Sequence, residues 1–559
     1  MPGLSIRLSA VAAAIVIVSA CGHSHAPPGG GSSTTRDGRL SPLLSKLGHL
    51  NAPVSTRSSE AQKYFNQGLT LVYAFNHAEA LRSFQEAARM DAGCAMAYWG
   101  QALALAPNIN DSAIGPDREE QGARAIAEAL HRKGGASGRE AALIDALAAR
   151  FELGGQPDRK ALNERYAAAM KQVRARFPED PDVATLFADA VMNTMPWDYW
   201  RGNTPKPGVQ EAREALERTI AKYPDHMGAH HMYIHLLEAS EWVDLTVPSA
   251  ERLGSLAPGA GHLVHMPSHV FIRVGRYEDA AAANERAVLA DEDYITQCRA
   301  QGIYPAAYYP HNVHFLNAAL VMSGRSREAI DSAFKVASRH ADHMLKQPGF
   351  GFAQLLRTIP VMTLVRFGKW QEILLQARPS AEFPYVVSMY HFARGYALAA
   401  QGKAEQARGE LEAMRVAAAD PTLKDEKVFD INSLEKLAGI GVAMLEGELA
   451  YRKKDWGGSM ASYGKAVELE DALLYSEPPD WMLPPRQYLG AAQLAAGKYA
   501  EAEATFRADL KRHRDNGWSL KGLEMALRKE GQGGEASEVE ARFRKAWNRA
   551  DVRIESSRF

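Results

Sequence analysis

The stretch "AGKYAEAEATFRADL" (496–510) decides the fold, because the same template recurs along the chain. The template is a Gly-led turn followed by a helix that carries small residues at fixed offsets. An apolar helix precedes each turn, and no segment stands out with the two-residue alternation of a strand. Self-similarity of this kind is typical of repeat proteins built from stacked helix pairs. The other copies are "VGRYEDAAAANERAV" (274–288), "SGRSREAIDSAFKVA" (323–337) and "QGKAEQARGELEAM" (401–414), with looser copies at 74–91 and 453–470.

These copies resemble the tetratricopeptide repeat (TPR), a helix–turn–helix unit of about 34 residues. The small and aromatic packing positions of that family are occupied by Ala280, Ala287, Ala407, Ala502 and Phe506. The resemblance implies an all-α fold, a right-handed α-solenoid of TPR-like helix–turn–helix repeats, with about eight to ten units. It also implies that positions 2, 5 and 9 of each first helix line a concave groove in which ligands bind.

The composition narrows the class of protein. The chain of 559 residues has a net charge of −1 and no long basic run, which argues against nucleic acid as a partner. Its length exceeds what one compact globule usually holds, in agreement with a repeat array. Cys94 and Cys298 lie too far apart in the sequence to form a disulfide framework, although a single bridge between them stays open.

The first residues predict export to the cell envelope. A short apolar run ends in "VSAC" (18–21), which resembles the lipobox of bacterial lipoproteins, where the Cys is acylated. The resemblance implies a signal peptide over 1–20, a membrane anchor on Cys21 and, from Gly22, the outer membrane of a Gram-negative cell. We therefore expect a periplasmic, lipid-anchored protein; an ordinary signal peptide with a chance Cys is the alternative. Residues 21–57 are predicted to be a flexible tether, since their first half is rich in Gly, Ser and Pro.

Three helical segments are expected after the tether. They are N-terminal TPR-like helices with an irregular insert (58–183), a His-rich TPR segment with the candidate metal site (184–345) and C-terminal TPR repeats (346–559). The connection "TMPWDYWRGNTPKPG" (194–208) interrupts a repeat with three aromatic residues. We interpret it as a packed capping loop, with a lid over the groove as the alternative.

Histidines cluster in the middle of the chain. Nine of the 18 histidines lie between positions 226 and 314. Counting from the repeat landmarks Pro224, Pro258 and Gly324 places seven of the nine at positions 2, 5 and 9 of the first helix in three consecutive repeats. These seven share one helix face in one register, and the TPR resemblance identifies that face as the groove; the other two are expected to be structural. The seven are His231, His235, His262, His265, His269, His311 and His314.

This register predicts a metal site. Neighbouring first helices in such a stack lie about 8–10 Å apart, so imidazoles on facing sides can meet at one ion. His231 with His235, and His265 with His269, are i, i+4 pairs that suit chelation from one helix. The expected cofactor is a transition metal, Cu, Zn or Fe, because imidazole ligands alone do not choose among these ions. A hydrogen-bonded polar groove that binds an acidic peptide is the alternative. Pro267 is expected to bend its helix, either to re-aim one imidazole ring or only to follow an irregular superhelix.

Acid–base groups near the histidines suggest chemistry. Glu238, Tyr233 and Arg273 are the candidates for a metal-dependent redox or hydrolytic reaction. The sequence contains no HExxH, GxSxG, GxxxxGK or CxxC motif, so proteolysis and phosphate-loop chemistry are not supported. The alternative function is a non-catalytic scaffold that holds a peptide or protein ligand in its concave groove during envelope assembly, and this rests on the fold alone.

Overall fold

The computed structural model describes residues 35, 38–152, 158–298, 300, 303–347 and 349–559, which divide into two compact units. The first unit comprises the described residues up to Val270 together with Arg286–Tyr309, and the second comprises Phe271–Glu285 and Pro310–Phe559. The boundaries between these two units differ from the segment boundaries after residues 183 and 345 that the sequence predicts. The signal peptide predicted at 1–20 and the predicted lipidation residue, Cys21, lie outside the described residues.

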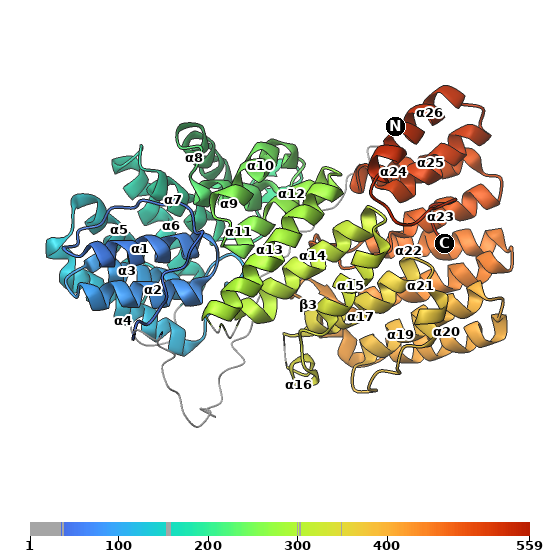
Figure 1. Ribbon diagram of the computed structural model, residues 1–559, viewed down its shortest axis with the longest axis horizontal. Helices are drawn as coiled ribbons and strands as arrows, with labels where there is room; N and C mark the ends of the chain where they lie inside the picture. The colour runs from blue at the N-terminus through green and yellow to red at the C-terminus, as the bar shows by residue number, and fades with distance from the viewer. Residues whose placement is uncertain (1–34, 36–37, 153–157, 299, 301–302, 348) are drawn as a thin grey trace. The chain divides into compact units, whose positions relative to one another are not determined.

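Helices that follow one another in the first unit pack side by side, mostly as antiparallel pairs (Figure 1). Their regularity follows from the apolar stripes and the caps; α7, for example, starts with Asp180 as N-cap and Pro181 at its first position. The helices are α1 (Ser59–Tyr73), α2 (His77–Met90), α3 (Ala95–Leu105), α4 (Pro116–Arg132), α5 (Gly138–Ala148), α6 (Arg159–Arg176), α7 (Pro181–Met192), α8 (Val209–Lys222), α9 (Met227–Leu237), α10 (Val247–Leu256) and α11 (Gly261–His265).

Three helices contain residues of both units: α12 (Pro267–Arg273), α13 (Tyr277–Cys298) and α14, whose first residue, Tyr309, belongs to the first unit. The second unit continues the helix–turn–helix pattern, and α19 with α20 and α21 with α22 form its most extensive pairs. Its helices are α14 (Tyr309–Met322), α15 (Ser326–Ala337), α16 (Asp342–Leu345), α17 (Gly351–Arg366), α18 (Trp370–Leu374), α19 (Pro384–Ala400), α20 (Ala404–Ala418), α21 (Leu434–Arg452), α22 (Trp456–Asp471), α23 (Pro485–Ala495), α24 (Tyr499–Arg512), α25 (Gly517–Lys529) and α26 (Gly533–Ala546).

The β-strands in the described residues form two small antiparallel hairpins, and one isolated bridge joins Asn108 and Asp111. The hairpins are β1 (Trp200–Arg201) with β2 (Thr204–Pro205), and β3 (Lys427–Val428) with β4 (Asn432–Ser433). Four short helical turns complete the elements: the 3₁₀ turns η1 (Lys133–Gly135), η2 (Val243–Thr246) and η4 (Pro421–Lys424), and the π-helical turn η3 (Tyr304–Tyr308). The all-α fold of TPR-like helix–turn–helix repeats is therefore confirmed.

One packing device recurs in both units: an aromatic ring on a second helix fits between two glycines on first helices. In the second unit, the Phe506 ring on α24 faces Gly490 on α23 and Gly522 on α25. In the first unit, the Phe84 ring on α2 faces Gly68 on α1 and Gly100 on α3 in the same way. The absence of a side chain at the glycines lets consecutive helices approach the ring, and Phe506 is the centre of a buried cluster with Ala502, Leu520, Leu523, Ala526 and Val539.

The segment before α1 lies on the first helices. Residues 38–57 form no helix, yet the amide of Leu40 donates to Glu86 and the hydroxyl of Ser41 donates to Glu79 at 2.6 Å. Ser55 donates from its amide and its hydroxyl to Glu140. This half of the predicted tether is thus held by hydrogen bonds to carboxylates, because extended backbone leaves donors that the glutamates accept.

Two further expectations concern cysteines and membranes. Cys94 and Cys298 are both buried and free, so the disulfide that stayed open from the sequence is not formed. Within the described part of the chain, no helix combines the length and the apolar character needed to span a bilayer.

The ring-between-glycines device makes a prediction. A Cβ at Gly522 would lie 2.2 Å from the Phe506 ring, so Gly522→Ala should lower the free energy of unfolding by about 1–3 kcal/mol through overpacking. Gly464 on α22 is the matched control, because a Cβ there meets nothing within 4 Å. Gly464→Ala should leave stability unchanged or raise it by up to about 1 kcal/mol. Urea unfolding followed by circular dichroism measures both, and equal shifts of the two midpoints would contradict the packing argument.

Candidate metal centre

Five histidines of the first unit meet in one buried cluster. α9 carries His231 and His235, α11 carries His262 and His265, and α12 carries His269. Their exposed fractions are between 0% and 4%, and successive ring centroids lie 4.6–6.0 Å apart. The shared register of these five therefore does correspond to convergence in space. The open groove that they were expected to line is not what the structure shows, because their rings are enclosed.

The helix that carries three of these histidines is interrupted at the proline. α11 ends at His265 and α12 begins at Pro267, whose ring nitrogen has no hydrogen to donate. The amide of His269 donates to the carbonyl of Met266 at 3.2 Å, a tighter turn than an α-helix makes. The break thus falls between His265 and His269, and their Nε2 atoms lie 2.9 Å apart.

The outer ring nitrogens of two histidines are hydrogen-bonded to oxygen acceptors. Nδ1 of His231 donates to the carbonyl oxygen of Tyr73 at 2.6 Å, and Nδ1 of His235 donates to Oε1 of Glu238 at 2.7 Å. A carbonyl and a carboxylate only accept, so in the neutral imidazoles the proton is on Nδ1. Nε2 of each ring then carries a free lone pair, which is the form that binds a metal ion.

Ring nitrogens of the first three histidines lie close together. Nε2 of His231 is 3.1 Å from Nε2 of His262, and one ring nitrogen from each of His231, His235 and His262 lies within 4.8 Å of the others. Among the described residues, none is a hydrogen-bond partner of Nε2 of His235 or Nδ1 of His262, although both atoms are buried. Buried nitrogens without a partner are uncommon in folded proteins and call for a ligand or water.

Burial and neighbouring charges keep two of the imidazoles neutral and the Glu238 carboxylate ionised. Burial lowers the pKa of His231 and of His262 well below the usual imidazole value, and the neighbouring imidazoles lower both further. Both rings are therefore neutral at neutral pH. Burial alone would raise the pKa of Glu238, but His269 and His235 outweigh this effect and lower the pKa, so Glu238 is ionised.

The remaining pair belongs to the same network. Nδ1 of His269 lies 2.8 Å from Oε2 of Glu238, so one carboxylate holds imidazoles from two helices. Nδ1 of His265 lies 3.3 Å from the hydroxyl of Ser268. Nε2 of His265 and of His269 face each other, as the Nε2 atoms of His231 and His262 do.

Aromatic side chains close the cluster. The Phe75 ring stacks on His235 (centroids 5.6 Å apart, planes at 9°) and on His262 (5.3 Å, 20°), and Trp197 meets His235 edge-on at 5.2 Å. Tyr308, in η3, meets His262 edge-on at 5.1 Å. The loop that interrupts the repeat at 194–208 is packed here, since Trp197 donates to Ile109 and Trp200 donates from its ring nitrogen to the carbonyl of Leu236.

Two of these aromatic residues adopt a left-handed backbone conformation. Phe75 has φ 53° and Trp197 has φ 63°, which cost energy for a residue with a Cβ. Phe75 stands where other repeats place their turn glycine, as Gly402 (φ 75°) and Gly497 (φ 78°) show. Such outliers persist where the surrounding structure enforces them, and here both rings lie against His235.

Sequence reasoning missed several contributors. Phe75 carried a signal, since the copy at 74–91 lacks the turn glycine of the template. The acceptor from Tyr73 is a backbone carbonyl and leaves no trace in the sequence. Tyr304 accepts from the amide of His262 at 3.1 Å and donates to the buried carboxylate of Asp291 at 2.8 Å, a contact made by η3 that no repeat landmark indicated.

Two predicted site residues lie in the second unit, on α14. His311 packs edge-on against Phe315. His314 is buried, and burial lowers its pKa from 6.5 to about 4. Both are described here within their own unit.

The three predicted acid–base residues have different surroundings. Tyr233 points to α8, where its hydroxyl donates to Glu217 at 2.9 Å, so it leaves α9 on another face than His231 and His235. Arg273 belongs to the second unit, where it lies over the ring of Tyr475. Glu238 is part of the histidine network of the first unit.

The sequence matches no known protein family and no curated protein. Among solved structures, the human IFIT1 dimer with m7Gppp-AAAA is 15% identical over 88% of this chain and 91% of that chain, with a TM-score of 0.28. The P58(IPK) TPR domain is 11% identical over 85% of this chain and 99% of that chain, with a TM-score of 0.20. At these values neither likeness bears on function, and the repeat architecture rests on the described helices themselves.

The double role of Glu238 predicts a stability effect. Glu238→Ala leaves two buried imidazole N–H groups without their acceptor and should cost about 3 kcal/mol or more of the free energy of unfolding. Glu241→Ala, on the exposed side of the following turn, is the control and should stay within about 0.5 kcal/mol of wild type. Denaturant unfolding measures both. A wild-type midpoint for Glu238→Ala would show that the carboxylate does not organise the cluster.

His314 predicts a pH effect. The unfolded chain takes up a proton on this residue below about pH 6.5, whereas the folded chain resists until about pH 4. Its contribution is therefore complete above pH 6.5 and is lost as the pH falls, at about 1.4 kcal/mol per pH unit. His314→Gln should make the unfolding midpoint less sensitive to acid between pH 6.5 and 4.5. If the unfolding midpoints of the variant and the wild-type protein changed in parallel with pH, His314 would not be a buried neutral imidazole.

Proposed function

We propose that the first unit binds a transition-metal ion through Nε2 of His231, His235 and His262. The observation that carries the proposal is the arrangement of the outer nitrogens. Nδ1 of His231 and Nδ1 of His235 are each fixed by an oxygen acceptor, which directs the free lone pairs on Nε2 into the buried cluster. Neutral imidazoles clustered without an ion gain little from such an arrangement.

The spacing supports the proposal. Metal–nitrogen bonds of about 2.0–2.1 Å at tetrahedral angles separate two ligand nitrogens by about 3.3 Å. The Nε2 atoms of His231 and His262 are 3.1 Å apart, and the three ring nitrogens lie within 4.8 Å of one another. Small side-chain rotations are enough to bring all three to one ion.

The surroundings have the features of an outer shell around a metal site. Metal-binding histidines usually donate their other ring nitrogen to a carboxylate or a backbone carbonyl, which fixes the ring and strengthens the ligand. Glu238 serves His235 in this way, and the carbonyl of Tyr73 serves His231. The ionised carboxylate also offsets part of the charge of a divalent ion.

Three imidazoles leave a coordination position for water or substrate. That ligand count is typical of catalytic centres, whereas structural zinc sites have four protein ligands. Zinc at this position would support hydrolysis, and copper or iron would support redox chemistry. We extend the proposal to a metal-dependent reaction on this ground, with Cu, Zn or Fe as the candidate ions.

The cellular location in this proposal is the one that the sequence predicts. A periplasmic location with a lipid anchor on Cys21 is part of the proposal and rests on the sequence. A scaffold that holds a peptide or protein is the alternative function, consistent with a helical repeat fold. The five clustered imidazoles are buried, so they do not offer a peptide-binding surface.

Metal content tests the proposal. The tagless protein, stripped and then incubated with Zn²⁺, Cu²⁺ or Fe²⁺ and desalted, should retain about one ion per chain by mass spectrometry, and bound zinc should show about three nitrogen neighbours at about 2.0–2.1 Å by X-ray absorption. His231→Ala with His262→Ala should abolish retention. His391→Gln, in the second unit, is the control and should retain it.

A graded variant separates binding from folding. Glu238→Gln should weaken metal affinity about 10–100-fold by removing the outer carboxylate while the ligands stay. Retention of no ion by wild-type protein that is folded by circular dichroism would overturn the proposal, as would equal retention by the double variant.

A further inference from the structure

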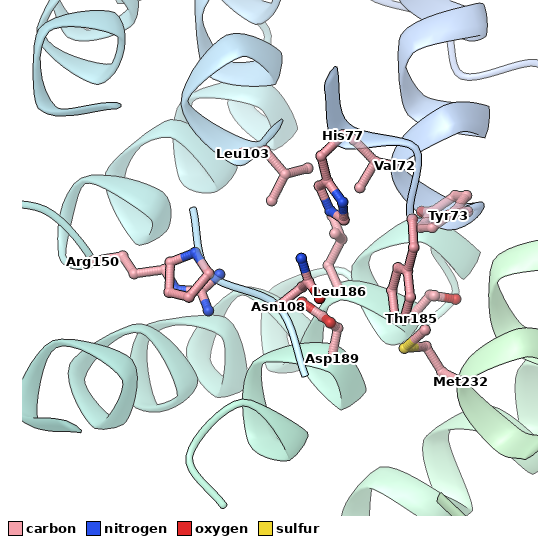
Figure 2. Close-up of a pocket in the computed structure, with 12 residues that line it drawn as sticks. Val72, Tyr73, His77, Leu103, Asn108, Arg150, Thr185, Leu186, Asp189 and Met232 are labelled. Atoms are coloured by element: carbon pink, nitrogen blue, oxygen red, sulfur yellow. The ribbon is translucent and has the colours of Figure 1, made fainter. Parts of the chain in front are cut away.

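A small cavity lies in the first unit beside the histidine cluster. Its volume is about 20 Å³, and its lining includes Phe75, Tyr73, His77, Asn108, Arg150 and Asp189 (Figure 2). Tyr73 and Phe75 belong to both features, since the first supplies the carbonyl for His231 and the second stacks on His235 and His262. No imidazole of the five-histidine cluster lines the cavity among the residues described, so it is a separate space.

Arg150 supplies a hydrogen-bond donor without a partner to this cavity. Its exposed fraction is 1%, its Nε donates to Oδ1 of Asn163 at 3.1 Å, and its guanidinium lies over the Tyr166 ring at 4.8 Å. These contacts hold the group from two sides. Within the described part of the chain, Nη2 of Arg150 has no hydrogen-bond partner.

The neighbouring arginines form close ion pairs, whereas Arg150 has only a longer-range attraction to Asp189. Arg118 pairs with Asp111, and Arg159 pairs with Glu119. No described carboxylate forms an ion pair with Arg150. A guanidinium keeps its proton even when buried, and an isolated buried charge is costly unless a counter-charge reaches it.

The other polar groups of the cavity include one free donor, one neutral imidazole and one carboxylate. Oδ1 of Asn108 accepts from the amide of Asn110 at 2.9 Å, and this leaves the Nδ2 group as a donor that no described residue uses. Burial, with the charges of Arg118 and Arg150, lowers the pKa of His77 to about 3, so this ring is neutral. Asp189 is the one acidic group in the lining, and burial raises its pKa to about 6.

We infer that this cavity binds a small monovalent anion, held by Nη2 of Arg150 and Nδ2 of Asn108. A volume of about 20 Å³ has room for one halide ion or for the carboxylate end of a small organic acid. A charge-assisted bond from the guanidinium supplies the main attraction. The inference rests on the Arg150 environment and stands independently of metal binding at the histidines.

Bromide and formate are the probes, the first for a free halide and the second for a carboxylate. Crystals of the full chain soaked in bromide should show an anomalous peak within hydrogen-bond distance of Nη2 of Arg150. In solution, the thermal unfolding midpoint should rise with the bound probe above the rise caused by gluconate, a monovalent anion too large for the cavity. The probe that gives the larger rise identifies the source of the charge.

Two variants are expected to change the anion affinity in opposite directions. Arg150→Gln should weaken anion affinity about 10–100-fold, since it removes a charged donor. Arg165→Gln, an exposed arginine on α6, is the matched control and should bind as wild type does. At pH 8, Asp189→Asn should bind bromide several-fold more tightly than wild type, because it removes the ionised carboxylate from the lining.

The outcomes decide the matter even if Arg150→Gln fails to fold, because Asp189→Asn and the crystal soak do not need that variant. Water alone beside Arg150 at saturating bromide and formate would overturn the inference. The inference would also be overturned if folded Arg150→Gln showed the same rise of the unfolding midpoint with added anion as the wild-type protein. The same holds if Asp189→Asn showed the same rise as the wild-type protein.

Discussion

The organisation of the first unit depends on one buried carboxylate. Glu238 follows the last turn of α9; its Oε1 accepts from His235 on its own helix, and its Oε2 lies 2.8 Å from Nδ1 of His269 on α12. A carboxylate in this apolar setting is stable only because its oxygens are hydrogen-bonded to imidazoles. In return it fixes the tautomer of both rings and the approach of α9 to α12. The direction of the free nitrogen on each of these rings follows from that single contact.

Much of this arrangement could be predicted from the sequence, for a physical reason. Repeats stack with a constant geometry, so residues in the same register of consecutive first helices come to lie side by side. The histidines at 231, 235, 262, 265 and 269 occupy such positions, and they do meet. The packing positions behaved in the same way, because Phe506 and Ala502 lie in one buried cluster.

The sequence did not reveal what covers the cluster. The covering rings are Phe75 from a turn, Trp197 from a loop and Tyr308 from a π-helical turn. Each lies more than 30 residues along the chain from the histidine that it covers and meets it only through tertiary packing. Repeat register says nothing about such insertions, and therefore an open groove was expected where the rings are enclosed. The direction of Tyr233 was missed because a helix buried on all sides has no polar face to orient it.

The enclosure of the cluster has a consequence for the proposed metal site. Because these side chains are 0–4% exposed, an ion held there would exchange with solvent only when the turn at Phe75 or the loop at Trp197 opens locally. Exchange would then be slow compared with folding. The identity of the ion would be set by which metal is present while the chain folds, instead of by the equilibrium preference for copper over zinc that exposed imidazoles obey.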